Sequence, residues 1–435
     1  MTILSNEPVA DAKQAFTSLR KLRVSVLLAS LSFGMLQLAL PLVAREMGAS
    51  ALLTGALLSV SALFIVAVQP IVGIGLDRFG RRPFLIMGLL SYAFSNAVFA
   101  LASSIGGLFL AQLAQGIGSG LLWLAALAIV SDLTPADSRG REYGGIEEVS
   151  FRGILIGTLV GFAMFHLLSQ DALGGIPLIT SWRILFLGFT AAALLAAVVV
   201  WRGIPESLQH GTDRPRKVPA VSAAQPVELA TKWRLSSQLC IVLGIVILTS
   251  SAGEIISPIL IKYLNDNIST KLVVIALAFL PAALVGAMLP SRLGGLSDRI
   301  GRRPPLIGAL LMGCLATLAI PFAQSLWPLA LLWAFEAAAF AAAVPAEEAL
   351  VVDLSGGARL GMVLGFYTAA SGLGGVLGPL LGGWLFGRFA ALSVFGTAAL
   401  LMALGAVLIW LLVREPSRDG SADDLVKYDD HPPFV

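Results

Sequence analysis

A charged turn of ten residues occurs twice in this chain, and each copy lies between two long apolar segments. The first copy begins at Gly73 and reads GIGLDRFGRR, and the second begins at Gly294, 221 residues later, and reads GGLSDRIGRR. Two such similar turns at a fixed offset indicate an internal duplication. A duplicated basic turn between apolar helices predicts a fold made of two parallel halves.

The apolar segments are long enough to cross a lipid bilayer. Hydrophobic residues make up 57% of the 435 residues and charged residues 13%, whereas roughly 25% of an average soluble domain is charged. A spanning helix needs about 20 apolar residues. The twelve segments that meet this length are approximately residues 22–44, 51–74, 84–104, 107–131, 143–168, 184–203, 236–261, 270–291, 305–324, 327–352, 361–386 and 391–413. The predicted fold class is therefore an all-α membrane protein with twelve transmembrane helices in two pseudo-symmetric six-helix bundles.

Lys and Arg residues are concentrated on one side of the predicted helices. With the N-terminus inside, most of the 29 basic residues fall in cytoplasmic segments, as the positive-inside rule requires. We therefore expect a multi-pass protein of the plasma membrane (the bacterial inner membrane) with both termini in the cytoplasm. The net charge of +3 then reflects contact with the lipid bilayer, and no nucleic-acid partner is expected.

The duplication also predicts the domain organisation, because the same offset matches Asp132 to Asp353 and Gly140 to Gly361. The expected parts are a cytoplasmic N-terminal segment (1–21), a first six-helix bundle (22–203), a proline-rich cytoplasmic linker (204–234), a second bundle (235–413) and a cytoplasmic tail (414–435). Since one chain supplies both halves, we expect a monomer.

Glycines recur at every fourth position in one helix of each half. They are Gly153, Gly157 and Gly161 in the first half and Gly374, Gly378 and Gly382 in the second, where Pro379 follows Gly378. Glycine at this spacing removes the side chains from one stripe of a helix and lets another helix approach closely. We expect both stripes to be helix-packing surfaces.

The chain resembles the major facilitator superfamily. The resemblance rests on twelve predicted helices, a mid-chain linker and two copies of G-x-x-x-D-R-x-G-R-R, with Pro205-Glu206-Ser207 after the sixth helix as a further similarity. It covers residues 20–415. It implies two bundles around a central cavity that opens alternately to each side of the membrane, and secondary transport of a small organic solute without a cofactor.

The charged turns are expected to act as a conformational lock. Asp77 can accept hydrogen bonds from the N-terminus of a neighbouring helix, whose dipole favours an anion. Arg81 is expected to pair with Asp132, and Arg302 with Asp353, only while the cytoplasmic side is closed, which would favour the outward-open state. The other members of the expected lock are Gly73, Arg78, Gly80, Arg82, Asp298, Arg299 and Arg303. Lipid phosphates are the alternative partners of Arg82 and Arg303.

Carboxylates inside the predicted helices are the candidates for proton coupling. An ionisable side chain at the bilayer centre costs on the order of 3 kcal/mol, so each one calls for an explanation. Glu336, about nine residues into the tenth helix, is the first candidate, followed by Glu254 and Glu148. A structural, hydrogen-bonded glutamate is the alternative for Glu336, and an i,i+4 ion pair with Arg152 is the alternative for Glu148.

The candidates for the substrate cavity are Gln37, Gln112, Gln115, Trp123 and Arg152. Trp123 could instead pack in the core. Glu347 and Glu348, near the inner end of the tenth helix, are expected to be gate or headgroup-level charges. The sequence contains no cluster with the spacing of a metal site or of a catalytic nucleophile, so neither a metal nor an enzymatic activity is expected.

Proton-coupled efflux of a lipophilic or cationic compound is the favoured function, because the cavity charges are largely acidic. The glycines around Pro379 resemble the antiporter motif of drug-exporting members, although that motif belongs in the fifth helix, where Thr158 replaces proline. Gln112 stands where exporters usually carry arginine. Two alternatives stay open: a proton-coupled importer of an organic anion or nutrient that binds Arg152, and a non-transporting membrane sensor or assembly protein with the same fold.

Overall fold

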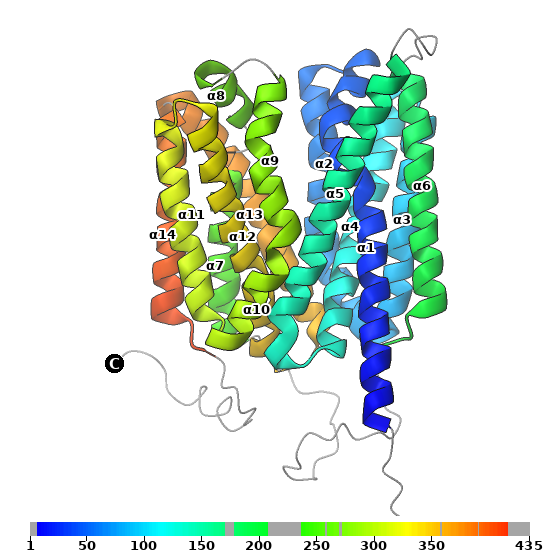
Figure 1. Cartoon of the computed structure of the whole chain (residues 1–435), viewed down its shortest axis with the longest axis vertical. Helices are drawn as coiled ribbons and strands as arrows, with labels where there is room; N and C mark the ends of the chain where they lie inside the picture. Colours follow the sequence, from blue (N-terminus) through cyan, green and yellow to red (C-terminus); the bar gives the residue numbers. More distant parts are fainter. Residues whose placement is uncertain are drawn as a thin grey trace, which may run out of the picture.

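The computed structural model of the chain describes residues 7–169, 178–207, 236–256, 259–268, 272–356, 359–389 and 391–415. Within these ranges the regular structure is helical, and the long helices run side by side (Figure 1). Most of the expected linker and tail, residues 208–235 and 416–435, lies outside the described residues.

Among the described residues, six α-helices belong to the first half of the chain and eight to the second. The first six are α1 (Glu7–Glu46), α2 (Ala51–Phe79), α3 (Arg81–Leu101), α4 (Ile105–Leu133), α5 (Arg139–Ser169) and α6 (Leu178–Gly203). The others are α7 (Ser237–Glu254), α8 (Leu260–Asn267), α9 (Leu272–Met288), α10 (Pro290–Ile300), α11 (Arg303–Ala319), α12 (Leu326–Leu354), α13 (Leu360–Phe389) and α14 (Ala391–Leu412). Short 3₁₀ turns, η1 (Ala136–Ser138) and η3 (Ile320–Phe322), precede α5 and follow α11.

Several helix boundaries differ from those expected. Helix α1 begins at Glu7 and not near residue 22, because residues 7–21 are mostly good helix formers and extend the helix beyond its apolar part. The eighth segment, expected over residues 270–291, ends as α9 at Met288, and a separate helix, α10, bent by 52° from α9, begins at Pro290 and runs into the charged turn. The seventh segment was expected to run to residue 261, but α7 ends at Glu254 and α8 follows.

The expected all-helical membrane fold is confirmed. Among the described residues, eight helices are long and apolar enough to cross a membrane, or nine when the bent pair α9–α10 counts as one span. Helices α1, α2 and α5 are 40, 29 and 31 residues long and run alongside them (Figure 1). The chain is therefore an integral, multi-pass membrane protein.

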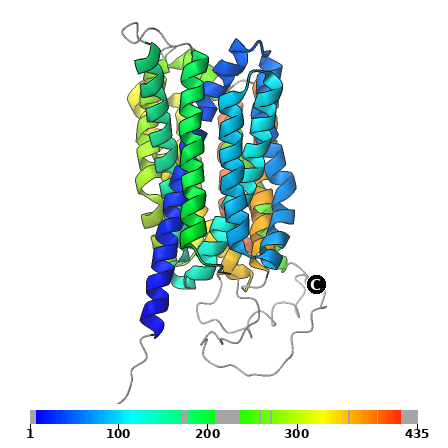
Figure 2. The ribbon, with the colours of Figure 1, turned by 90° about the vertical axis from the view of Figure 1, so that its right-hand side faces the viewer.

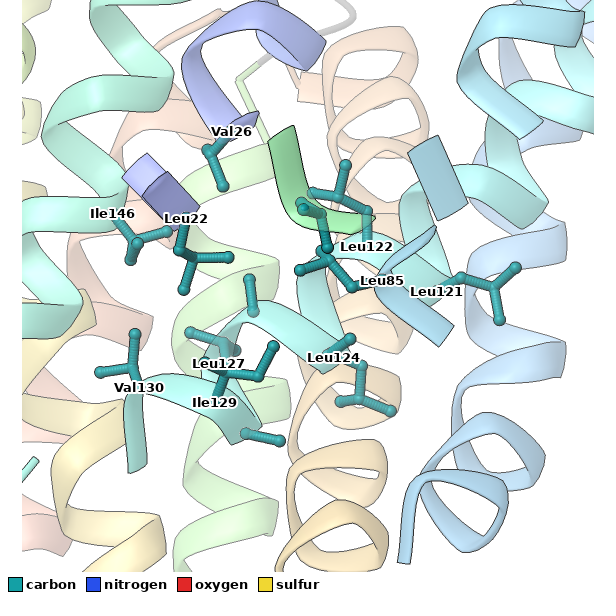
Figure 3. Close-up of a cluster of buried hydrophobic side chains, with 14 of the residues drawn as sticks. Leu22, Val26, Leu85, Leu121, Leu122, Leu124, Leu127, Ile129, Val130 and Ile146 are labelled. Atoms are coloured by element: carbon teal, nitrogen blue, oxygen red, sulfur yellow. The ribbon is translucent and has the colours of Figure 1, made fainter. Parts of the chain in front are cut away.

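The helices form two bundles, α1–α6 and α7–α14, which stand beside each other in Figure 1 and one behind the other in Figure 2. Both charged turns lie at the lower end in these views, which we call the motif end. One apolar core at this end combines the first bundle with Ala349, Val352, Leu360 and Leu364 of the second, and Figure 3 shows its first-bundle part. At the opposite end the two described cores are each confined to one bundle. The bundles are thus packed together at the motif end.

The glycine stripes pack against equivalent helices in the two bundles. A Cβ atom on Gly153 would lie 2.5 Å from the carbonyl oxygen of Leu27 on α1, and one on Gly378 would lie 2.6 Å from that of Ser251 on α7. Neither space admits a methyl group, so α5 can approach α1, and α13 can approach α7, only because these positions are glycine.

We predict that Gly157→Ala destabilises the protein, because its Cβ would overlap the carbonyl oxygen of Leu31 on α1. The matched control is Gly188→Ala in α6, where a Cβ meets no atom within 4 Å. The measurement is the thermal unfolding midpoint in detergent. We expect a decrease of several degrees for the first variant and none for the control, since alanine favours helix by about 1 kcal/mol over glycine. Equal midpoints for the two variants would contradict this packing.

Candidate functional site

Asp77, at the end of α2, joins the two bundles at the motif end. Its carboxylate accepts hydrogen bonds from the backbone N–H groups of Gly361 at 2.8 Å and Met362 at 2.9 Å. These amides lie in the first turn of α13, where they have no partner within the helix. The positive end of the helix dipole also favours the anion. Asp77 therefore stabilises the contact between the first bundle and the second.

Asp298, at the end of α10, makes the equivalent contact in the opposite direction. It accepts hydrogen bonds from the N–H groups of Gly140 at 2.9 Å and Arg141 at 2.8 Å, in the first turn of α5. The internal duplication relates these residues to Asp77, Gly361 and Met362. The motif end is consequently closed by two related junctions, α2–α13 and α10–α5.

Glycines let the helices cross closely at both junctions. A Cβ atom on Gly361 would lie 2.5 Å from the carbonyl oxygen of Gly73, and one on Gly140 would lie 2.5 Å from that of Gly294. Each motif thus combines a glycine that allows close approach with an aspartate, one helical turn further on, that binds the opposite helix N-terminus.

Arg81 holds the first junction from within its own bundle. Its side chain is 4% exposed, with Nε 3.2 Å from Asp132 and Nη2 3.2 Å from Asp77. Nη1 donates to the carbonyl oxygen of Leu76 at 2.5 Å. The structure therefore brings the expected partners Arg81 and Asp132 together. Because both residues belong to the first bundle, this pair does not itself join the bundles, and the expectation that it forms only in the closed state stays a prediction.

Arg302 contacts both bundles. Its guanidinium group lies 3.1 Å from Asp353 and 2.5 Å from Asp298, and it donates to the carbonyl oxygen of Ala136 in the first bundle at 2.6 Å. Asp353 also pairs with Arg139 of α5 at 2.7 Å. The second junction thus has more contacts between bundles than the first.

Two glutamates that sequence analysis did not assign cap the helices after the charged turns. Glu206 accepts hydrogen bonds from the N–H groups of Arg81 at 2.8 Å and Arg82 at 3.1 Å. Glu415 accepts equivalent bonds from the N–H groups of Arg302 and Arg303. The Pro-Glu-Ser sequence after α6 points to Glu206. Glu415, which follows α14, is not related to Glu206 by the offset of the duplication, so the repeat does not reveal it.

The remaining residues of the two turns shape the ends of the helices. Arg82 and Arg303 donate to the carbonyl oxygens of Trp201 and Trp410, at the ends of α6 and α14. These carbonyls are partners of the two guanidinium groups within the protein, and the alternative of lipid phosphates stays open. Gly80 and Gly301 have φ angles of 98° and 99°, which favour glycine. Arg78 and Arg299 are exposed.

A cluster of three carboxylates forms where the bundles meet. Glu147 on α5 interacts electrostatically with Glu348 on α12, which also interacts with its neighbour Glu347. Tyr367 on α13 donates a hydrogen bond to Glu347 at 3.3 Å. Glu348 is 4% exposed, and within the described part of the chain its buried Oε2 has no hydrogen-bond partner. Glu348 is thus no headgroup-level charge, because the interface between the bundles buries it.

The surroundings of this carboxylate cluster are aromatic and largely neutral. Tyr143 on α5 is fully buried and lies within electrostatic range of Glu348 and of the Arg139–Asp353 pair. Arg139 is engaged by Asp353. Three like charges in a poorly solvated space repel one another strongly. A proton or another positive charge in the cluster would relieve this repulsion.

The other acidic candidates lie apart from this cluster. Glu336 on α12 is half-buried and accepts a hydrogen bond from Thr317 of α11 at 3.0 Å, a contact within the second bundle. Glu254 is exposed at the end of α7, beside Gly378. Glu148 forms the i,i+4 ion pair with Arg152, whose Nε donates to the carbonyl oxygen of Ala287 at 2.8 Å.

The polar cavity candidates divide into three groups. Gln112 and Gln115 are buried in α4, and both polar atoms of the Gln115 side chain lack a partner within the described residues. Trp123 packs against the apolar core of the first bundle. The side chain of Gln37 lies outside the described part of the chain. Gln69, which sequence analysis did not single out, accepts a hydrogen bond from Thr368 of the other bundle at 2.7 Å.

We predict that hydrogen exchange will respond locally to loss of each aspartate. Asp77→Asn should speed exchange at the start of α13. In the wild type the two carboxylate oxygens accept hydrogen bonds from two backbone N–H groups, whereas the asparagine NH₂ group would leave one of those N–H groups without an acceptor. Asp298→Asn should do the same at the start of α5. Each variant is the control for the other. Unchanged exchange in both peptides would contradict the two junctions.

Comparison with known proteins identifies the family. The family model described as Major Facilitator Superfamily matches residues 23–236 and 242–425. The chain is 27% identical to "Multidrug resistance protein MdtG" of Dickeya zeae over 84% of this chain and 85% of that protein. It is 26% identical to "Uncharacterized MFS-type transporter YuxJ" of Bacillus subtilis over 83% and 88%.

Solved structures show the same fold. The human organic anion transporter MFSD10 (TETRAN) aligns with a TM-score of 0.69 at 21% identity over 91% of this chain and 99% of that chain. FucP in the outward conformation aligns with a TM-score of 0.71 at 17% identity over 92% and 100%. With the family model covering most of the sequence, the chain belongs to the Major Facilitator Superfamily of membrane transporters.

Proposed function

We propose that the protein exports a lipophilic or cationic compound across the plasma membrane (the bacterial inner membrane) in exchange for protons. The relatives named as multidrug resistance proteins support export, and they cover most of this chain at about a quarter identity. The Lys and Arg distribution supports a cytoplasmic motif end with both termini on the same side. On this assignment the described state is closed to the cytoplasm.

The observation that carries the proposal is the carboxylate cluster of Glu147, Glu347 and Glu348 between the bundles. Separation of the bundles would move Glu147 away from the other two and expose all three to water. Closure over three ionised carboxylates is unfavourable, since they lose hydration and repel one another. Closure therefore requires a positive charge in the cluster.

That requirement provides a physical basis for exchange. A proton can neutralise the cluster in one direction of the cycle, and a cationic substrate can do so in the other. If the motif end closes only when a proton or a substrate is bound, the carrier cannot change state with an empty cluster. Proton entry is then coupled to substrate exit. In this scheme Glu347 and Glu147 replace Glu336 as the first candidates for the coupling site.

We predict that cells expressing the protein accumulate less of a fluorescent lipophilic cation than cells with an empty vector, and that a protonophore abolishes the difference. Efflux-deficient bacteria provide the background. Glu347→Gln and Glu147→Gln should each remove most of the export, because a neutral amide cannot exchange a proton. Glu142→Gln is the matched control on α5, since Glu142 pairs with Arg23 of α1 at 2.6 Å and lies apart from the cluster.

Each outcome of this experiment has a distinct meaning. Accumulation equal to the empty vector would contradict export of that cation and favour uptake assays with organic anions. Export that survives the protonophore would contradict proton coupling. Full proton-dependent export by both cluster variants would contradict the assignment of the cluster, and loss of coupling in Glu336→Gln alone would return the role to Glu336.

We predict separately that Asp77→Asn abolishes transport without preventing membrane insertion. The substitution weakens the α2–α13 junction by about 1–3 kcal/mol, which shifts the equilibrium between the two states roughly five- to 150-fold. Transport rate and the amount of protein in isolated membranes are the two readouts. Glu46→Gln, at the exposed opposite end of α1, is the control. Wild-type transport by a well-inserted Asp77→Asn variant would contradict the proposed lock.

A further inference from the structure

A second charged site lies on the other side of the α5–α10 junction. A cavity of about 700 Å³ is formed there by residues of both bundles, near the motif end. Arg141 and Arg152 of α5 line it from the first bundle, and Arg292 and Arg299 of α10 line it from the second. Figure 1 shows α5 and α10 side by side at this place.

Helical periodicity places this cavity on the outer surface. At about 100° per residue, one side of α5 carries positions 141, 148 and 152. Tyr143 and Glu147 lie on the other side of the helix, toward α12 of the second bundle. Gly140 and Gly144, which touch α10, lie between these two sides. The side chain of Arg152 is 45% exposed, and Arg141 and Arg292 are exposed. In a membrane, this side of the junction faces lipid.

The charges of the cavity favour an anion. Its carboxylates are Asp137, Glu148 and Asp298. Two of these already bind protein groups: Glu148 accepts from Arg152 and Ser291, and Asp298 accepts from the start of α5 and from Arg302. The arginines outnumber the carboxylates, and guanidinium groups bind phosphate oxygens in a bidentate manner.

Apolar side chains complete the cavity wall. Met288, at the end of α9, is 54% exposed, and Leu296 of α10 is 43% exposed. A water-soluble anion would use only the arginines. A phospholipid would use both features, with its phosphate among the guanidinium groups and its acyl chains against the apolar residues. Basic pockets between helices at the cytoplasmic side of a membrane suit anionic headgroups.

We propose that this cavity binds the headgroup of an anionic phospholipid, of the phosphatidylglycerol type. Because the arginines come from both bundles, the bound phosphate bridges α5 and α10 and stabilises the state in which the motif end is closed. Separation of the bundles would divide the site. The assignment does not depend on which solute is transported or on proton coupling.

The test is native mass spectrometry of the detergent-purified protein, titrated with phosphatidylglycerol or with phosphatidylcholine of the same acyl chains. We expect the wild type to bind phosphatidylglycerol more tightly than phosphatidylcholine. The Arg152→Gln/Arg292→Gln variant should bind phosphatidylglycerol with an affinity at least about tenfold lower than that of the wild type. Arg202→Gln, at the exposed end of α6, is the control and should retain wild-type binding. Arg292→Gln alone leaves the Glu148–Arg152 pair intact and should show a smaller loss.

A second arm separates lipid from free phosphate. Phosphatidylglycerol should raise the thermal unfolding midpoint of the wild type more than that of the double variant, whereas water-soluble glycerol 3-phosphate should raise neither. Equal stabilisation by glycerol 3-phosphate would contradict a lipid site and indicate a site for free phosphate esters. Equal binding of phosphatidylglycerol by the double variant and the wild type, or an equal loss in Arg202→Gln, would overturn the proposal.

Discussion

A carboxylate placed at the N-terminus of a helix in the opposite bundle is the interaction on which the rest of the structure depends. Asp77 binds the start of α13 and Asp298 binds the start of α5, so the two halves hold each other reciprocally. When the bundles separate, water replaces these partners, and each hydrogen bond contributes only about 1 kcal/mol net. Junctions of this strength can hold one state and still be reversed by a bound ligand or proton.

Sequence analysis could predict what is local or duplicated. The apolar segments indicated the helical membrane fold, and the repeated turn, at one fixed offset, pointed to Asp77 and to the Arg81–Asp132 and Arg302–Asp353 pairs. It could not predict contacts that depend on how the bundles dock. From one helix alone, Glu347 and Glu348 are expected to be gate or headgroup-level charges, and the sequence does not distinguish the two. Their burial arises from α5 and α13, which belong to distant parts of the chain.

Helix α5 connects these features because each of its sides contacts a different part of the structure. Gly140 and Gly144 touch α10, Glu147 faces the second bundle's carboxylates, and Arg152 lines the outer cavity. One movement of α5 against α10 would therefore break the Asp298 junction, divide the carboxylate cluster and open the arginine cavity together. In this account a proton on the inner side and a lipid phosphate on the outer side both stabilise closure of the motif end.

The central claim is that neutralising the carboxylate cluster closes the motif end. The most direct measurement is the distribution of distances between spin labels at the exposed, duplication-related positions 79 and 300, with labels at 101 and 322 reporting the opposite end. At acidic pH we expect the short distance between 79 and 300 to dominate. At alkaline pH a longer distance should grow while the opposite end closes. Identical distributions at both pH values, or a change of the opposite sign, would contradict the account.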